Sequence, residues 1–118
     1  MLSLALPGKV YLCLTPTDMR KSFDGLSALV RSGLGGDPLS GHLFVFRNRR
    51  GDRLKLLYWD TDGLAVWAKR LERGTFEFPG VRSAAASVEV SSTDLALILG
   101  GIDLGSVKRR PRYQRLAS

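Results

Sequence analysis

Cysteine and histidine are almost absent from this sequence. Its 118 residues include one cysteine, Cys13, and one histidine, His42. A single cysteine excludes an intramolecular disulfide and a cysteine-based zinc cluster, and a place inside the apolar run 10–14 favours a small buried side chain over a nucleophile. No serine or cysteine motif accompanies His42, which we interpret as the first residue of a strand and not as a general base. We therefore predict no catalytic residue, no metal and no cofactor.

Long apolar runs are also missing. None approaches the roughly 18 residues of a transmembrane helix, and the first residues lack the basic, apolar and cleavage-site order of a signal peptide. We expect no membrane partner and a cytoplasmic location. The length predicts one domain, residues 1–106, followed by a basic and flexible C-terminal tail, residues 107–118. The sequence leaves the oligomeric state open.

Acidic residues are scarce relative to basic ones. Eighteen lysines and arginines against eleven acids give a net charge of +7. Five of the cations lie within residues 47–55 and five within 108–115, a segment without any acid. Clustered positive charge favours a polyanionic partner such as DNA, whereas a purely solvated surface is the alternative. The candidate nucleic-acid-binding residues are Arg20, Lys21, Arg47, Arg49, Arg50, Arg53, Lys55, Lys108, Arg109, Arg110 and Arg112.

The central stretch, residues 42–60, is typical of a β-hairpin. Two runs rich in β-branched and aromatic residues, 43–46 and 54–59, flank a polar connection around Gly51. Both faces of each run are apolar, which is typical of strands covered on both sides. The hairpin thus presents a rigid stem with a cationic tip. We prefer contact with phosphates to a merely solvated turn, because arginine suits bidentate phosphate binding.

The rest of the chain supplies strands and helices around this hairpin. Residues 10–14 and 87–90 are strand candidates, and so are residues 75–78. Apolar residues from Met19 to Val30 recur at helical spacing, with Thr17 or Asp18 as the N-cap. A last helix, residues 95–99, is opened by Ser-Ser-Thr-Asp and ended by glycines. The order predicts an α+β fold: a mainly antiparallel sheet with a central hairpin, two or three helices packed on it, and hairpins rather than regular βαβ crossovers.

Residues 64–73 fit two structures. Leu64, Trp67 and Leu71 are spaced as on one face of a helix, with Asp62 as its cap and Gly74 as its end. We favour this helix. The alternative is a strand with Leu64 and Val66 pointing inward.

Two further groups of residues could carry chemistry. Free N–H groups at the start of the helix after Thr17, with Arg20 and Lys21 beside them, would suit a phosphate; the alternative is an ion pair of Arg20 with Asp24 and a solvated Lys21. Asp60 and Asp62 are spaced like the start of a metal loop, but no third ligand follows in step, so we prefer a capping role. Trp59 and Trp67 are interpreted as core residues rather than base-stacking platforms.

Most of the chain, from about residue 8 to 104, resembles a known family. The strings VYLCLTPTDMRKSFDGL, DPLSGHLFVFRNRRGDRLKLLYWDTDG, KRLERGTFEFP and LILGGID are similar to those of the TnpB-like accessory protein encoded by the second reading frame of insertion-sequence-66 transposons. The resemblance implies a small protein that acts beside a separately encoded transposase, which carries the catalytic acids. Ser22 stands where a glycine is common, and Leu104 where we would expect a tryptophan.

These observations lead to one main hypothesis and two alternatives. We expect a non-catalytic accessory protein of transposition that binds DNA, with transposon ends as the expected DNA, through the hairpin tip, the segment around Arg20 and the basic tail. The first alternative is a protein-interaction module that docks the transposase without recognising DNA. The second is a metal-dependent nuclease that uses Asp60 and Asp62.

Overall fold

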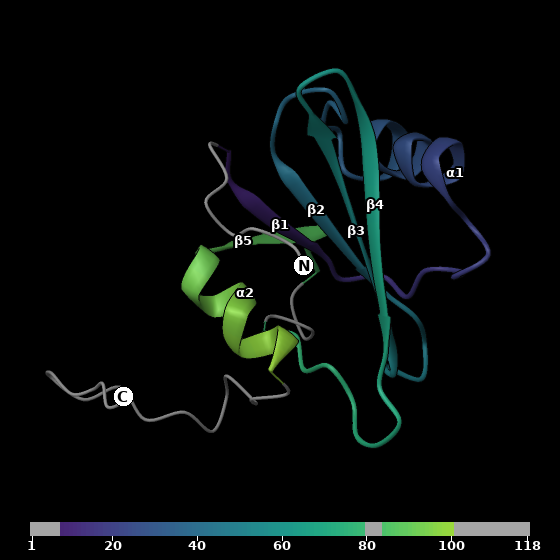
Figure 1. The fold of residues 1–118 in the computed structure, drawn as a ribbon, viewed down its shortest axis with the longest axis vertical. Coiled ribbons are helices and arrows are strands. Elements are labelled where there is room, and N and C mark those ends of the chain that lie inside the picture. The colour runs from purple at the N-terminus through teal and green to yellow at the C-terminus, as the bar shows by residue number, and fades with distance from the viewer. Residues whose placement is uncertain (1–7, 80–83, 101–118) are drawn as a thin grey trace, which may run out of the picture.

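A five-stranded sheet forms the centre of the protein in the computed structural model, which describes residues 8–79 and 84–100 (Figure 1). The strand order across the sheet is β4-β3-β2-β1-β5. The strands are β1 (Val10–Cys13), β2 (Leu43–Arg47), β3 (Arg53–Asp60), β4 (Gly63–Arg70) and β5 (Ser87–Val90). The helices are α1 (Phe23–Ala28), which continues as a π-helical segment, η1 (Leu29–Gly33), and α2 (Ser92–Leu99).

The sheet is mainly antiparallel, as predicted. β2 pairs with β3, β3 with β4, and β1 with β5 in antiparallel register. The exception is the parallel pair of β1 and β2, in which Tyr11 lies opposite Phe44. Helix α1 connects these two strands, so this part of the fold is a βαβ crossover. The expectation that the fold uses only hairpins was wrong here, because a parallel neighbour requires a crossover connection.

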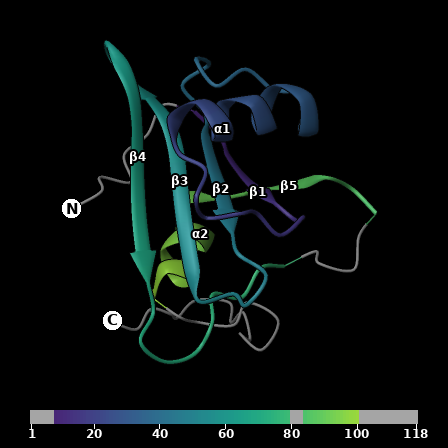
Figure 2. The ribbon, with the colours of Figure 1, turned by 90° about the vertical axis from the view of Figure 1, so that its right-hand side faces the viewer.

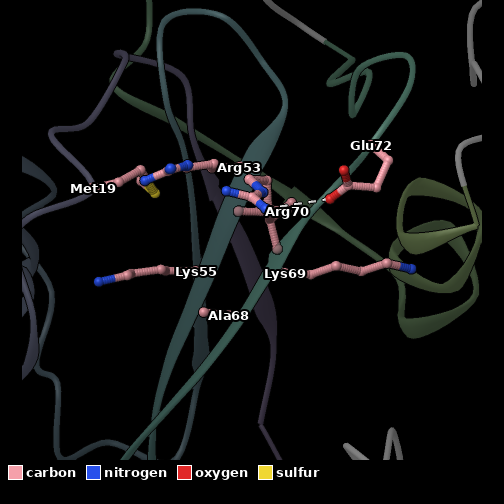
Figure 3. Close-up of a pocket in the computed structure, with 8 residues that line it drawn as sticks. Met19, Arg53, Lys55, Ala68, Lys69, Arg70 and Glu72 are labelled. Atoms are coloured by element: carbon pink, nitrogen blue, oxygen red, sulfur yellow. Dashed lines mark hydrogen bonds and ion pairs between the residues drawn. The ribbon is translucent and has the colours of Figure 1, made fainter.

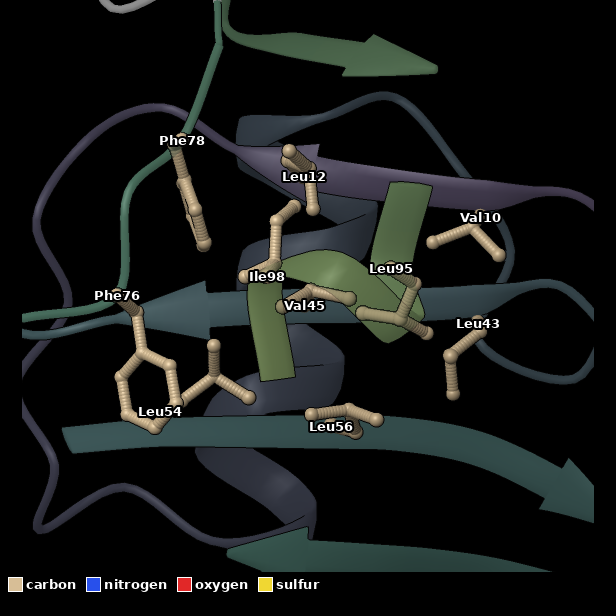
Figure 4. Packing of buried hydrophobic residues seen from close by; sticks show 10 residues of the cluster. All are labelled: Val10, Leu12, Leu43, Val45, Leu54, Leu56, Phe76, Phe78, Leu95 and Ile98. Atoms are coloured by element: carbon tan, nitrogen blue, oxygen red, sulfur yellow. The ribbon is translucent and has the colours of Figure 1, made fainter. Parts of the chain in front are cut away.

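Helices cover the two faces of the sheet, α1 on one side and α2 on the other (Figure 2). On the α2 side, side chains such as Val45 and Leu56 pack against Leu95 and Ile98 of the helix (Figure 4). On the α1 side, Phe44, Phe46 and Leu57 pack against Leu26 and Val30. The apolar residues on both faces of the hairpin are thus accounted for by two cores, one on each side. The predicted α+β class and the central position of the hairpin are confirmed.

The favoured helix over residues 64–73 is wrong, and the alternative strand is correct. Residues 63–70 form β4, which pairs with β3 along its whole length after a two-residue turn at Thr61 and Asp62. Leu64 and Val66 then face the α1 side, while Trp67 joins the core on the α2 side. Cross-strand pairing with an adjacent strand outweighs a helical spacing that rests on three residues.

Three other elements differ from the sequence-based expectation, two in their start and one in its existence. Helix α1 begins at Phe23, after Ser22, and not near Thr17, because the Asp18 side chain accepts hydrogen bonds from Arg20 in a turn of its own. Residues 75–78 form no strand, although Phe76 and Phe78 are buried. Helix α2 begins at Ser92 and not at the predicted residue 95, inside the Ser-Ser-Thr-Asp segment that was expected to open it. Ser91 and Asp94 form a capping box in which each side chain bonds the other residue's backbone N–H.

Candidate nucleic-acid interface

The hairpin tip is a tight, internally bonded turn. The backbone N–H of Gly51 donates to the Asn48 carbonyl at 3.1 Å, and the Asn48 side chain accepts from Arg53 N–H and donates to Asp52. Gly51 has φ of +80°, and a Cβ there would also lie 3.2 Å from Thr75. The positive φ strongly favours glycine at this position, and a side chain there would also crowd Thr75. The turn therefore holds the backbone of Arg49 and Arg50 in one conformation.

Three neighbouring segments hold the tip in place. The N–H of Thr17 donates to the Arg47 carbonyl at 2.9 Å, that of Leu71 to Asp52 at 2.8 Å, and that of Phe76 to Gly51 at 2.7 Å. The bonds come from the loop before α1, the end of β4 and the segment after it. The backbone of the tip is thus held by three segments, so little conformational entropy of this backbone would be lost when a partner binds.

A groove of about 550 Å³ lies between the tip, the loop before α1 and the end of β4. Five arginines and two aspartates are among the residues that line it: Arg20, Arg49, Arg50, Arg53 and Arg70, with Asp18 and Asp52. We call this the arginine groove. A second depression of about 390 Å³ continues from it along β3 and β4, and shares Met19, Arg53 and Arg70 with it (Figure 3).

Arg53 and Arg70 are direct cross-strand partners. The sequence-based list of candidate DNA-binding residues includes Arg53 but not Arg70. The register places Arg53 of β3 opposite Arg70 of β4. Asp52 and Leu71, the next pair along, share a backbone hydrogen bond, so Arg53 and Arg70 form the closer, non-bonded kind of pair. Like charges directly opposite each other are unfavourable, and a bound anion would relieve the repulsion. Placing residues 64–73 on a strand would have revealed this pair.

Carboxylates neutralise only part of the arginine groove. Arg20 forms a close ion pair with Asp18 at 2.7 Å, and Arg70 lies 3.4 Å from Glu72. Arg50, whose side chain is 84% exposed, is 3.9 Å from Asp52. The pKa of Asp52 is lowered, first by the hydrogen bond from Asn48 and then by Arg50. The side chains of Arg49 and Arg53 have no hydrogen bond or ion pair within residues 8–79 and 84–100.

The ion pair of Asp18 and Arg20 predicts an acid-shifted titration. The hydrogen bond from the Arg20 side chain lowers the pKa of Asp18 to about 2, from a usual 3.8. The pair therefore stabilises the turn fully above pH 3.8, and the stabilisation is lost as pH falls toward 2. NMR titration of the Asp18 carboxyl group should show a midpoint near 2, and in Arg20→Ala a higher midpoint that stays below 3.8, because the backbone N–H of residue 20 still donates to Asp18. An unchanged midpoint in that variant would assign the shift to another group.

Two predicted cations, Arg47 and Lys55, have structural contacts instead of an open position. The Arg47 guanidinium is half-buried on the α2 side, where it donates to the Phe76 carbonyl at 2.7 Å and lies 4.4 Å from the centre of the Phe78 ring. Burial lowers its pKa, while Glu77 partly offsets this. Lys55 Nζ donates to the Lys21 carbonyl at 2.8 Å and so ties the loop before α1 to β3. We therefore leave Arg47 and Lys55 out of the arginine groove.

The helix-terminal phosphate site is not supported. Arg20 and Lys21 precede α1, and Arg20 pairs with Asp18 and not with Asp24. The Lys21 side chain is the neighbour of Gly25, since a Cβ on Gly25 would lie 3.0 Å from it.

Other candidate residues have the following places. Cys13 is buried, as predicted, and His42 precedes β2, where its Nδ1 accepts from Lys9 N–H at 2.9 Å. Asp60 ends β3 and Asp62 lies in the turn between β3 and β4, so neither caps a helix. Within the described residues, no three His, Cys, Asp or Glu side chains are grouped as metal ligands would be, and no helix is long and apolar enough to span a membrane.

The predicted sites in the tail cannot be placed. Lys108, Arg109, Arg110 and Arg112, together with the whole segment 107–118, lie outside the described residues. Their role in binding stays a prediction.

The fold and the groove define a small α+β protein with a cationic recess at one end of its sheet. A family model described as IS66 Orf2 like protein matches residues 8–109, and the chain belongs to this family. Two proteins of Sinorhizobium fredii, both named as uncharacterised, are similar to it. One, y4jC, is 41% identical over 103 residues, which cover 87% of this chain and 86% of the relative. The other, y4hO, is 39% identical over 95 residues, 80% of this chain and 81% of the relative. No solved structure matches the chain.

Proposed function

We propose that this protein is a non-catalytic accessory factor of transposition that binds the phosphate backbone of duplex DNA in the arginine groove. Membership of the IS66 Orf2 like family supports the accessory role in transposition. The observation that favours DNA is the convergence of Arg49, Arg50, Arg53 and Arg70 on one supported recess with few carboxylates. Arginine side chains hold phosphates in a bidentate manner and release counterions when they bind.

The groove favours contacts to phosphates over the reading of bases. Its exposed cations come from a turn and from two strand ends, and neither α1 nor α2 contributes a residue to its lining. Phosphate contacts orient a protein on DNA but carry no sequence information directly. We therefore expect binding that is strong at low salt and similar for transposon-end and scrambled duplexes.

The double variant Arg49→Ala/Arg50→Ala tests this proposal. Both side chains are exposed, so we expect duplex affinity to fall about tenfold at low salt with little change in melting temperature. The slope of log affinity against log salt should become shallower by about two, one for each lost contact. Fluorescence anisotropy with a labelled duplex across a salt series measures both quantities.

A matched control removes the same charge elsewhere. Lys9→Ala/Arg31→Ala lowers the net charge by the same amount at exposed positions outside the groove. If both double variants lose affinity equally, general charge and not the groove accounts for binding. Absence of binding by the unaltered protein at low salt would contradict the proposal.

The second candidate function is docking of the separately encoded transposase. Family membership supports an association with that protein, and the same groove could hold acidic side chains. Pull-down with the transposase from a nuclease-treated extract separates the two functions. Retention after nuclease favours direct docking, and loss favours a DNA bridge.

A further inference from the structure

The outer edge of β4 is unpaired within the described residues. β4 ends the strand order on one side of the sheet, next to β3 alone, and it is eight residues long (Figure 1). Its first six residues, Gly-Leu-Ala-Val-Trp-Ala, contain no charge and no proline. Proteins usually protect a long edge strand with charged residues, with proline or with a bulge. The pairing of β4 with β3 shows no interruption in register.

The pairing of β4 with β3 determines which β4 residues direct their backbone N–H and C=O groups toward β3 and which direct them outward. The bond from Leu71 N–H to the Asp52 carbonyl fixes which residues on the β4 side face β3. Because bonded and non-bonded pairs alternate in an antiparallel ladder, the N–H and C=O groups of Leu64, Val66 and Ala68 point away from β3. These groups form an open ladder that another strand could complete.

The charges at the two ends of β4 suit a second copy of the same strand. Lys69 and Arg70 end the strand, while Asp60 and Asp62 lie at its beginning. Antiparallel pairing of two β4 strands would place the basic end of each beside the acidic turn of the other, whereas parallel pairing would bring like charges together. With Val66 opposite its own symmetry mate, Arg70 lies opposite Asp62, and Trp67 lies opposite the small Ala65.

We propose that two copies of this protein pair antiparallel through the outer edges of β4 and form one continuous sheet across a two-fold axis. The interface is isologous, so it closes at two copies. The opposite edge of the sheet is the four-residue β5, which is too short to favour further growth. This dimer does not depend on the proposed binding of DNA.

The variant Ala68→Pro tests the pairing directly. Proline removes an outward N–H and leaves the bonds to β3 intact, a position that edge strands tolerate. Ala68 is exposed, so its side chain contributes little to packing. Sedimentation velocity of the full chain without nucleic acid, over a concentration series, should give a dimer for the unaltered protein and a monomer for Ala68→Pro. Ala68→Thr keeps the N–H and should remain a dimer.

Exchanging the charges of Asp62 and Arg70 provides a second test, which leaves every backbone N–H in place. Asp62→Lys should weaken dimerisation about tenfold, because two symmetry-related pairs change from attraction to repulsion. Adding Arg70→Asp should restore it, while Asp24→Lys, an equal charge change on exposed α1, should have no effect. A monomeric unaltered protein, or a dimer unaffected by both Ala68→Pro and Asp62→Lys, would overturn the proposal. Arg49→Ala/Arg50→Ala should stay dimeric, which separates this result from a failure of DNA binding.

Discussion

Truncation of Phe76 to alanine is expected to lower the free energy of unfolding by about 3–5 kcal/mol. The Phe76 ring is fully buried in the core on the α2 side, together with Leu54 and Ile98. Its backbone N–H also holds Gly51 of the hairpin tip. The variant thus creates a cavity next to the segment that supports the arginine groove. Urea unfolding monitored by tryptophan fluorescence measures the loss.

A conservative variant separates packing from the backbone contact. Phe76→Leu keeps most of the apolar volume and should cost clearly less than Phe76→Ala. Thr75→Ala removes an exposed neighbour from the same segment and should cost little. If Phe76→Ala and Thr75→Ala lowered stability equally, the burial of Phe76 would not determine the stability of this segment.

Features set by local residue patterns could be predicted from the sequence. The hairpin of β2 and β3 follows from two β-rich runs around a polar turn, and its two apolar faces predict cover on both sides. Helix α2 follows from the Ser91 and Asp94 capping box. The position of β1 follows from the short apolar run that contains Cys13. In each case the local pattern and the tertiary packing favour the same structure.

Features set by distant partners could not be predicted in the same way. Leu64, Trp67 and Leu71 fit a helix as well as a strand, and only pairing with β3 distinguishes the two. Helix α1 begins later than the residue pattern predicts, because the Asp18 carboxylate accepts from Arg20 in a separate turn. The cationic character of the tip was predicted correctly, but the place of Arg70 opposite Arg53 depends on the same pairing with β3.

Arg47 shows why a cluster in sequence differs from a cluster in space. It belongs to the same basic run as Arg49 and Arg50, yet strand alternation directs its side chain to the α2 face. Phe76 and Phe78, about thirty residues later in the chain, provide a carbonyl and an aromatic ring that bind its guanidinium. A remote segment therefore converts a candidate DNA contact into a structural one.

Replacement of Arg47 by alanine is accordingly expected to destabilise the fold by about 2 kcal/mol while affecting DNA affinity less than Arg49→Ala. The loss combines one charge-assisted hydrogen bond, a cation–π contact and the packing of the side-chain stem. Arg47→Lys keeps the charge but cannot reproduce the planar contact with Phe78, so it should recover only part of the stability. Urea unfolding and duplex anisotropy on the same samples measure both effects.

A double-mutant cycle connects the two stability predictions. Arg47 and the Phe76 backbone share a hydrogen bond, so Arg47→Ala and Phe76→Ala should not be additive, and the double variant should lose less stability than the sum of the single ones. Additive losses would mean that the contacts of Arg47 do not depend on the packing of Phe76. A larger loss of DNA affinity in Arg47→Ala than in Arg49→Ala would return Arg47 to the binding surface, and the support of the tip by residues 74–78 would then have to be reconsidered.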